Sequence, residues 1–402
     1  MAQKVENTLD ALLKDGFAKP RAKEYLTVLE EERDTPTGDA AMGFNHDAVD
    51  GYDTGLFDPD YLEWAHSYGF YAKQAYAYDL CEDNIDDYMS DYDYHRVWPL
   101  NGWQRIWIND KLTLKYMLAG SSFDEYLPEY YYYSTPSGPL PLLESSMKPG
   151  DASFLDTLRS VGEFACKPCN GSRTVGFHKL SYVDGDYLVD NKPSSAEGVL
   201  EFLHKNPNYV FTEFLHPSEQ MAKVSPVINN LRLQVFNPTG VEPVIGASYF
   251  RIAMDVDGDD SKTNYRYPSK ADYGNYNLWF DWKTGWYGKG VIIYANRYVD
   301  SPCSPDTGNL AEGVLEGWQE VVDLALEMSA RLNPLEYLGY DICLTDKGPK
   351  IIEINSYSGC KYLQFFQPFY KDEYLSTYFR DKLAAIDALG ADEVLRRNAI
   401  VR

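Results

Sequence analysis

The segment GYDICLTDKGPKIIEINSYSG, residues 339–359, concentrates side chains that could bind a metal ion. Two apolar stretches around a Gly-Pro turn predict a strand hairpin that brings Asp341 nearly opposite Glu353. With Asn355 they offer two carboxylates and an amide oxygen, the hard oxygen ligands that Mg²⁺ prefers. A divalent ion would also relieve the repulsion between two neighbouring carboxylates. The alternative is an exposed polar strand face that holds no ion.

The face of each side chain in this hairpin follows from the alternation of a regular strand. Ile351, Glu353 and Asn355 are expected on one face of the second strand. Ile352 and Ile354 are then expected to face the core. This arrangement would place both polar side chains next to Asp341.

A second candidate lies in the segment ACKPCNGSRTVG, where a strand ends in a lysine and runs into a glycine-containing loop. Backbone N–H groups of such a loop can bind phosphate, and the lysine supplies a positive charge. The segment is neither a Walker A sequence nor a dinucleotide-binding glycine motif, and its glycines could instead serve only as turn residues. The candidate phosphate-contacting residues are Lys167, Gly171, Ser172 and Arg173.

These candidates need strands and helices to position them, and the chain supplies an alternating series. Hydrophobic spacing predicts a helix over residues 1–34, a loop over 35–55, and a helical segment with a solvated acidic face over 59–94. A strand at 127–134 is expected to be broken by the Gly and Pro residues of 135–141. Further strands are expected at 162–168, 177–183, 185–190, 209–215, 231–237, 243–253, 338–345 and 350–355, and helices at 110–120, 195–206, 311–333 and 372–392.

Composition limits the class of protein. The 402 residues are enough for two or three domains, and 15% aromatic residues indicate a folded chain. A net charge of −24 argues against a nucleic acid bound over a broad surface, although a nucleotide could bind in a local basic cleft. No apolar stretch approaches the length that spans a bilayer, and the N-terminus has no signal-peptide pattern. We therefore expect no membrane association and a cytoplasmic protein.

Cysteine and histidine do not dominate the predicted chemistry. The six cysteines are scattered, so a disulfide scaffold is not expected, and Cys166 is predicted to be a buried structural thiol in spite of its C-x-x-C spacing with Cys169. The six histidines show no metal-binding spacing. No Cys–His or Ser–His pair stands out as a nucleophilic site.

Taken in order, the motifs resemble the ATP-grasp superfamily. DKLTLK is similar to its first phosphate-contacting helix, ACKPCNGSRTVG to its strand lysine and phosphate loop, VFTEFL to its adenine hinge, and GYDI with IIEINSYSG to its metal signature. The resemblance spans roughly residues 105–385. The segment FLHPSEQMAKVSPVINNLRLQVF is most similar to the sugar-transfer-associated ATP-grasp proteins, in which a His-Pro element and an Asn-x-Leu-Arg strand follow the hinge.

The resemblance implies an α+β fold in which two α+β subdomains clamp ATP, preceded by a mainly helical region. Its implied division is a Tyr- and Asp-rich helical region at 1–104, an N-terminal ATP-grasp part at 105–212, a C-terminal part at 213–390, and a tail at 391–402. The first 100 residues have no clear counterpart in the family. The loop SYSGCKY replaces a commoner small-Pro-Gly pattern, so the family's substrates do not transfer to this chain.

The family's site residues map by position onto this sequence. Lys115 or Lys111 would contact the nucleotide phosphates, with Lys115 the better spaced, and Lys167 would contact the α- and β-phosphates. Glu213 would lie at the adenine hinge. Asp341, Glu353 and Asn355 would hold Mg²⁺, with Mn²⁺ as a substitute. Arg232 and Arg251 would face the transferred phosphate or the acyl phosphate as catalytic groups, or else form ordinary surface salt bridges.

The implied activity is an ATP- and Mg²⁺-dependent ligase that joins a carboxylate to an amine through an acyl phosphate, releasing ADP and phosphate. By resemblance to the subgroup, its setting would be polysaccharide or natural-product assembly. Two alternatives stay open: a small-molecule or sugar kinase with the same fold, and a non-catalytic nucleotide-binding scaffold. A glycoside hydrolase that uses the two carboxylates would leave the neighbouring lysines unexplained. The oligomeric state is not predicted, a dimer being only the common default.

Overall fold

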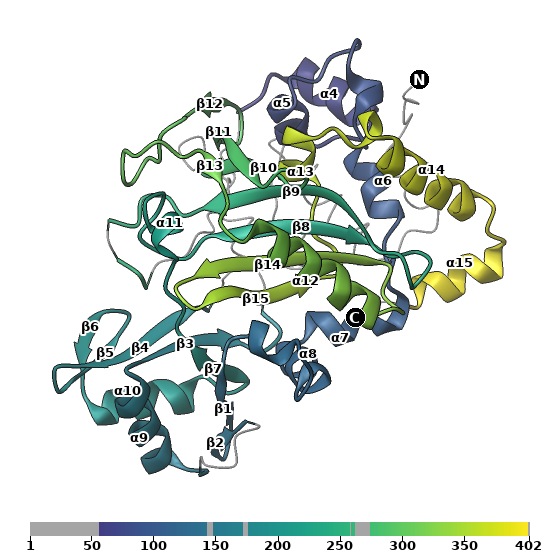
Figure 1. Ribbon diagram of the computed structural model, residues 1–402. Coiled ribbons are helices and arrows are strands. Elements are labelled where there is room, and N and C mark those ends of the chain that lie inside the picture. Colours follow the sequence, from purple (N-terminus) through teal and green to yellow (C-terminus); the bar gives the residue numbers. More distant parts are fainter. Residues whose placement is uncertain (1–55, 143–147, 172–175, 258, 262–273, 401–402) are drawn as a thin grey trace.

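The computed structural model describes residues 56–142, 148–171, 176–257, 259–261 and 274–400. The expected helix at 1–34 and loop at 35–55 lie outside these residues. The described chain forms two antiparallel sheets with helices packed on them, an α+β architecture as predicted (Figure 1). None of the helices in the described part is long and apolar enough to cross a membrane.

The smaller sheet has seven antiparallel strands in the order β2-β1-β7-β3-β4-β5-β6. Helices α9 (Asp151–Val161) and α10 (Ala196–Lys205) pack on it, and Phe154 of α9 shares a buried cluster with Phe164 and Phe211 of the sheet. The strands are β1 (Tyr130–Thr135), β2 (Gly138–Pro141), β3 (Glu163–Pro168), β4 (His178–Val183), β5 (Asp186–Val189), β6 (Lys192–Ser194) and β7 (Tyr209–Glu213).

The larger sheet has eight antiparallel strands in the order β12-β11-β10-β9-β8-β14-β15, with β13 paired to β11. In the chain its strands come after β7 and after a short helix, α11 (Glu219–Ala222). The strands are β8 (Asn230–Phe236), β9 (Val244–Ile252), β10 (Asn275–Asp281), β11 (Trp286–Ile293), β12 (Tyr298–Asp300), β13 (Gly313–Val314), β14 (Tyr337–Thr345) and β15 (Gly348–Asn355).

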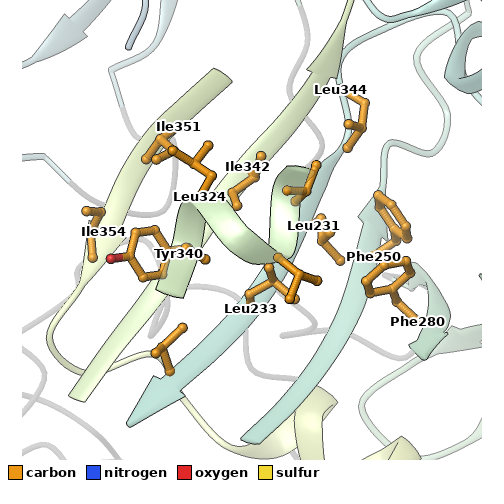
Figure 2. Packing of buried hydrophobic residues seen from close by; sticks show 14 of the residues in the cluster. Leu231, Leu233, Phe250, Phe280, Leu324, Tyr340, Ile342, Leu344, Ile351 and Ile354 are labelled. Atoms are coloured by element: carbon orange, nitrogen blue, oxygen red, sulfur yellow. The ribbon is translucent and has the colours of Figure 1, made fainter. Parts of the chain in front are cut away.

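Helix α12 (Trp318–Arg331) covers one face of the larger sheet (Figure 1). Figure 2 shows Leu324 of this helix among side chains of the strands, including Leu231, Tyr340 and Ile342. Because every second residue of β8 and β14 contributes to this core, the polar residues between them must lie on the opposite face. That opposite face carries the candidate site.

Short helices from both ends of the chain pack on the opposite face of the larger sheet. Met89 and Val97 from the N-terminal region share a buried cluster with Phe236 of β8 and Phe379 of α14. The N-terminal helices are therefore part of the core of the larger unit. The remaining helices of the described chain are α4 (Pro59–Ser67), α5 (Ala72–Ala77), η2 (Ile85–Asp87), α6 (Asp91–Arg96), η3 (Gly102–Arg105), α7 (Ile106–Asn109), α8 (Lys111–Leu118), η4 (Asp124–Tyr126), α13 (Lys361–Phe366), η5 (Phe369–Lys371), α14 (Glu373–Asp387) and α15 (Ala391–Asn398).

Several boundaries differ from the sequence prediction. Residues 135–141 do not break strand β1 but turn it into the β1–β2 hairpin. Strands β10 and β11 were not predicted. The long helix begins at Trp318 rather than near 311, because Gly313 and Val314 pair with β11 and Gly317 takes a left-handed φ of 68°. The last predicted helix is divided into α14 and α15.

The acidic segment at 59–94 does not present a wholly solvated face. Asp91 is buried and accepts hydrogen bonds from the backbone N–H of Tyr71 at 2.9 Å and the side chain of Gln74 at 3.1 Å. The segment is also divided into short helices instead of one long one. Helical periodicity in the sequence predicted that this segment is helical. The hydrogen-bond partners of Asp91 result from the packing of the fold, which periodicity does not specify.

Candidate functional site

Strands β14 and β15 bring the two predicted carboxylates together. Asp341 is the direct cross-strand partner of Glu353, as the Gly-Pro turn implied. The register then shifts, so that Ile342 pairs with Ile351 and Ile352 is an extra residue in β15. Ile351 therefore lies in the core with Ile354, as Figure 2 shows, and not beside Glu353. The predicted face of Ile351 was wrong because a regular alternation cannot anticipate a bulge.

Asp341 is held by a dense set of donors on this face. Arg232 of β8, its cross-strand neighbour on the other side, donates from Nε to Oδ1 at 2.6 Å and from Nη2 to Oδ2 at 2.9 Å. Asn230 donates to Oδ1 at 2.9 Å and Asn355 to Oδ2 at 3.2 Å. Burial disfavours the Arg232 charge, but Asp341 outweighs it and raises the pKa of the guanidinium. Asn230 was not predicted as a site residue, although its alternation with Arg232 in the segment NLR places both on one face.

Glu353 differs from Asp341 in lacking such donors: none of the described side chains donates a hydrogen bond to its carboxylate. Burial raises the pKa of Glu353, and the neighbouring Asp341 adds to the effect, while Lys111, Arg232 and Lys167 oppose it. A partly buried carboxylate with cations nearby but no hydrogen-bond donor is suited to an additional positive ligand.

Two of the predicted lysines converge on this carboxylate. Lys167 ends strand β3, and burial followed by the charge of Lys111 lowers its pKa to about 8. Lys111, in the first turn of α8, donates from Nζ to the carbonyl oxygen of Gly171 at 2.9 Å. The helix begins at Asp110, whose carboxylate accepts from the backbone N–H of Thr113 at 2.7 Å. Two cations therefore lie beside the start of the predicted phosphate loop.

The remaining loop residues are only partly visible. Ser172 and Arg173 lie outside the described residues. Gly176, after the loop, has a φ of 77°, and a Cβ there would lie 2.5 Å from the hydroxyl oxygen of Tyr209. A turn role therefore accounts for Gly176 without any ligand.

Lys115 occupies a different environment from Lys111, although both belong to α8. Its Nζ is 2.5 Å from Oδ1 of Asp124 and 5.6 Å from the centre of the Tyr130 ring. Its charge is thus already paired within the fold. The geometry favours Lys111 over Lys115 as the lysine that faces a phosphate, the reverse of the order expected from spacing.

Glu213 lies at the end of β7, where the chain passes from the smaller sheet to the larger one. It is buried, and its carboxylate accepts from Lys347 and from the backbone N–H of Glu129. The N–H of Glu213 itself donates to the carbonyl oxygen of Glu129 at 2.8 Å. These contacts tie Glu213 to both sheets, as a hinge position requires.

A second ionic network, which was not predicted, joins the two sheets beside the hinge. His216 lies 2.8 Å from Glu163, which also contacts Lys179 at 2.5 Å. Lys179 reaches Asp260, beyond β9 of the larger sheet, at 2.6 Å. The hydrogen bond from His216 is the main cause that lowers the pKa of Glu163 to about 2, and Glu163 in turn raises the pKa of His216.

Arg251 of β9 is on the same sheet face as Arg232 but not in contact with the carboxylates. It pairs across the strands with Asn230 and lies 4.6 Å from the centre of the Tyr362 ring of α13. It is buried, and its Nη2 is 3.3 Å from the hydroxyl of Tyr249. Arg251 is therefore a buried residue, and it marks the α13 side of the site.

The side-chain oxygens of Asp341, Glu353 and Asn355 fit a magnesium ion if the amide of Asn355 rotates. Asp341 uses both lone pairs of each oxygen for the bonds from Arg232, Asn230 and Asn355. A half-turn of the Asn355 amide would free a lone pair on Oδ2 of Asp341 and present the amide oxygen beside it. Glu353 then completes a set of three oxygen ligands. Among the described residues no group of three or more His, Cys, Asp or Glu side chains is placed to hold a metal ion. Mg²⁺ commonly takes one or two carboxylates together with substrate phosphates.

Comparison with known protein families finds a match to part of the chain. Residues 193–368 match the model of the sugar-transfer associated ATP-grasp family. The resemblance seen in the motifs is thereby confirmed over this range. The matched range contains the hinge, the Asn-x-Leu-Arg strand and the metal signature, and it begins after Lys167. A search of curated proteins gives no match.

Three solved structures resemble the chain only distantly. D-alanyl-alanine synthetase A from Vibrio cholerae is 14% identical, with 69% of this chain and 66% of that chain covered and a TM-score of 0.39. D-alanine–D-alanine ligase from Bacillus anthracis is 12% identical, with 71% and 70% covered and a TM-score of 0.35. L-amino acid ligase from Bacillus licheniformis is 11% identical, with 83% and 56% covered and a TM-score of 0.34. The chain spans just under two thirds of the first of these proteins.

Proposed function

We propose that this protein is an ATP- and Mg²⁺-dependent ligase that joins a small-molecule carboxylate to an amine through an acyl phosphate. The observation that carries the proposal is the placement of Lys111 and Lys167 beside Glu353, with Asp341 and Arg232 next in line across the sheet. Cations and carboxylates in one row suit a bound Mg·ATP, whose phosphates need cations and whose metal needs oxygen ligands.

In the proposed reaction an oxygen of the substrate carboxylate forms a bond to the γ-phosphorus of ATP, and the bond from that phosphorus to ADP breaks. The amine nitrogen then bonds to the acyl carbon, phosphate leaves with the electrons of the C–O bond, and the amine loses a proton. Lys111 and Lys167 would hold the phosphates, and Arg232 would stabilise the charge that develops on the transferred group. Asp341, Glu353 and Asn355 would hold Mg²⁺, which supplies neutralisation of the phosphate oxygens.

A hydroxylamine trap tests the reaction class. The purified chain is incubated with ATP, MgCl₂, hydroxylamine and a panel of carboxylic acids, and both ADP and hydroxamate are measured. A ligase yields hydroxamate with the right acid. A kinase yields ADP with a hydroxyl compound but no hydroxamate, and a non-catalytic scaffold binds nucleotide without producing ADP.

Matched variants test the site within the same assay. Glu353→Gln keeps the shape of the side chain but removes the charge, and we expect at least about a hundredfold loss of turnover with weaker Mg²⁺-dependent nucleotide binding. Lys111→Gln should raise the KM for ATP about tenfold or more, because it removes a cation that faces the phosphates. Lys115→Gln, one helical turn later, is the control and should leave that KM within about twofold. An unchanged Glu353→Gln variant would show that the site is assigned wrongly.

A further inference from the structure

The loop Ser356–Gly359 leaves β15 directly after Asn355 and lies against the carboxylate site. Its Ser358 carbonyl oxygen accepts from Nη1 of Arg232 at 2.6 Å, while the other nitrogens of that guanidinium bind Asp341. A Cβ on Gly339 would lie 2.3 Å from Oγ of Ser358, so loop and strand β14 are in close contact. The loop therefore helps to fix the direction of Arg232.

This loop is held from the N-terminal region at successive residues. Asn109 of α7 accepts from the backbone N–H of Ser356 at 3.4 Å. The hydroxyl of Tyr357 lies 3.0 Å from Nδ1 of His95 in α6, and the two rings stack with their centres 5.9 Å apart. Together these contacts give the N-terminal helices control over a loop that is more than 240 residues away in the chain.

His95 is also held through its second ring nitrogen. Its Nε2 lies 2.6 Å from the hydroxyl of Tyr71, and the histidine is buried. A neutral imidazole donates from one nitrogen and accepts at the other, and a tyrosine hydroxyl can do either. Bonds from both nitrogens thus fix the rotation of the ring, and through it the position of Tyr357.

A second set of hydrogen bonds fixes the position of Ser358. Its Oγ donates to the hydroxyl of Tyr337 at 3.0 Å, and that hydroxyl also lies 2.7 Å from the hydroxyl of Tyr94 in α6. The ring of Tyr94 packs on Tyr357 with the centres 4.7 Å apart. Helix α6 therefore reaches the loop through two adjacent residues, Tyr94 and His95.

We propose that His95 is a positioning residue for the substrate side of the site: clamped between Tyr71 and Tyr357, it fixes the loop 356–359 so that Ser358 directs Arg232. The role of Arg232 in the reaction rests on the proposed function, whereas the control of the loop by His95 does not. The nucleotide side is held separately, since neither Lys111 nor Lys167 forms a hydrogen bond or ion pair with this loop in the part of the chain that the structure describes.

Hydrogen exchange tests the control of the loop without any substrate. Tyr357→Phe keeps the stacked ring and removes the hydroxyl, and we expect the backbone amides of 356–360 to exchange at least about tenfold faster. His95→Asn retains a polar atom near Nδ1, whereas His95→Gln retains one near Nε2. The Asn variant should therefore protect the loop better than the Gln variant, a difference that general damage to the fold would not produce.

Two controls belong to this experiment. Amides of the β14–β15 turn, residues 345–350, should exchange at the wild-type rate in every variant. Tyr132→Phe removes a tyrosine hydroxyl of the smaller sheet that lies 2.9 Å from Oγ of Ser153 in α9, and it should leave the loop unchanged. Equal loop exchange in the wild type, Tyr357→Phe and His95→Gln would overturn the proposal.

Kinetics then separate this proposal from the proposed function. With an acid identified by the hydroxylamine trap, Tyr357→Phe should raise the KM for the acid about tenfold and leave the affinity for Mg·AMP-PNP within twofold. An equal loss of nucleotide affinity would overturn the positioning role. If the wild type forms no hydroxamate with any acid, the proposed function fails, and the exchange measurement still decides whether His95 controls the loop.

Discussion

The lowered pKa of Lys167 makes nucleotide affinity depend on pH in a direction that can be stated in advance. In the free protein burial and the neighbouring Lys111 lower this pKa from 10.5 to about 8. Phosphate binds the charged ammonium, so binding above pH 8 requires the protein to take up a proton. Affinity should therefore be constant below about pH 7 and fall as the pH rises through 8.

The size of the effect follows from the two pKa values. A change from 10.5 to about 8 corresponds to about 3 kcal/mol between the charged and neutral forms. If bound phosphate restores the usual pKa, the Kd for Mg·AMP-PNP should double at pH 8 and rise about tenfold at pH 9, relative to pH 6.5. The same reasoning predicts uptake of about half a proton per nucleotide at pH 8.

Titration calorimetry between pH 6.5 and 9.5 measures both quantities, with two buffers of different ionisation enthalpy to count protons. Lys167→Arg is the matched control, because a guanidinium keeps its charge throughout this range. The variant should give a flat profile even if its affinity is lower. A flat profile in the wild type, or the same slope in the arginine variant, would refute the assignment of the titrating group to Lys167.

Three further predictions concern stability. Asp341→Asn should lower the free energy of unfolding by about 3 kcal/mol because it leaves the buried Arg232 charge under-compensated; urea unfolding should show that adding Arg232→Met recovers part of the loss, and strictly additive losses would contradict the pairing. Leu324→Ala should cost about 3 kcal/mol through a cavity under α12 and lower Tm without changing nucleotide affinity. His216→Gln should lose at most about 1 kcal/mol, since the pair with Glu163 is partly exposed. Because the pKa of His216 is raised, its stabilisation is complete below pH 6.5 and is lost as the pH rises, so the difference in Tm should shrink towards pH 9; the Glu163 share persists above pH 4.5 and is lost only as the pH falls towards 2.

Short sequence patterns were sufficient to predict those features of the fold that depend on residues close together in the chain. The Gly-Pro turn and its apolar flanks predicted the β14–β15 hairpin and the pairing of Asp341 with Glu353. The Asp110 cap predicted the start of α8. Strands β10 and β11 were not predicted, although β10 carries alternating apolar residues such as Tyr276 and Leu278.

Other features depend on register, which no local pattern specifies. The bulge at Ile352 moved Ile351 into the core, because the sheet accommodated one extra residue instead of keeping a strict alternation. Helical spacing allowed either Lys111 or Lys115 to face the nucleotide. Only the contact of Lys115 with Asp124 indicated that its charge is already paired.

The sequence by itself determined the family resemblance, the hairpin and the residue types that can bind magnesium and phosphate, because each depends on short motifs. Tertiary structure alone decided that Arg232 and Asn230 engage Asp341, and that Tyr71 and His95 reach Tyr357 near the other end of the chain. Asp341 lies more than 100 positions from Arg232 and Asn230, and Tyr357 lies more than 100 positions from His95. Tyr71 is linked to Tyr357 through His95. These contacts exist only because the larger sheet and the N-terminal helices bury a common core, which fixes partners that no spacing along the chain can specify.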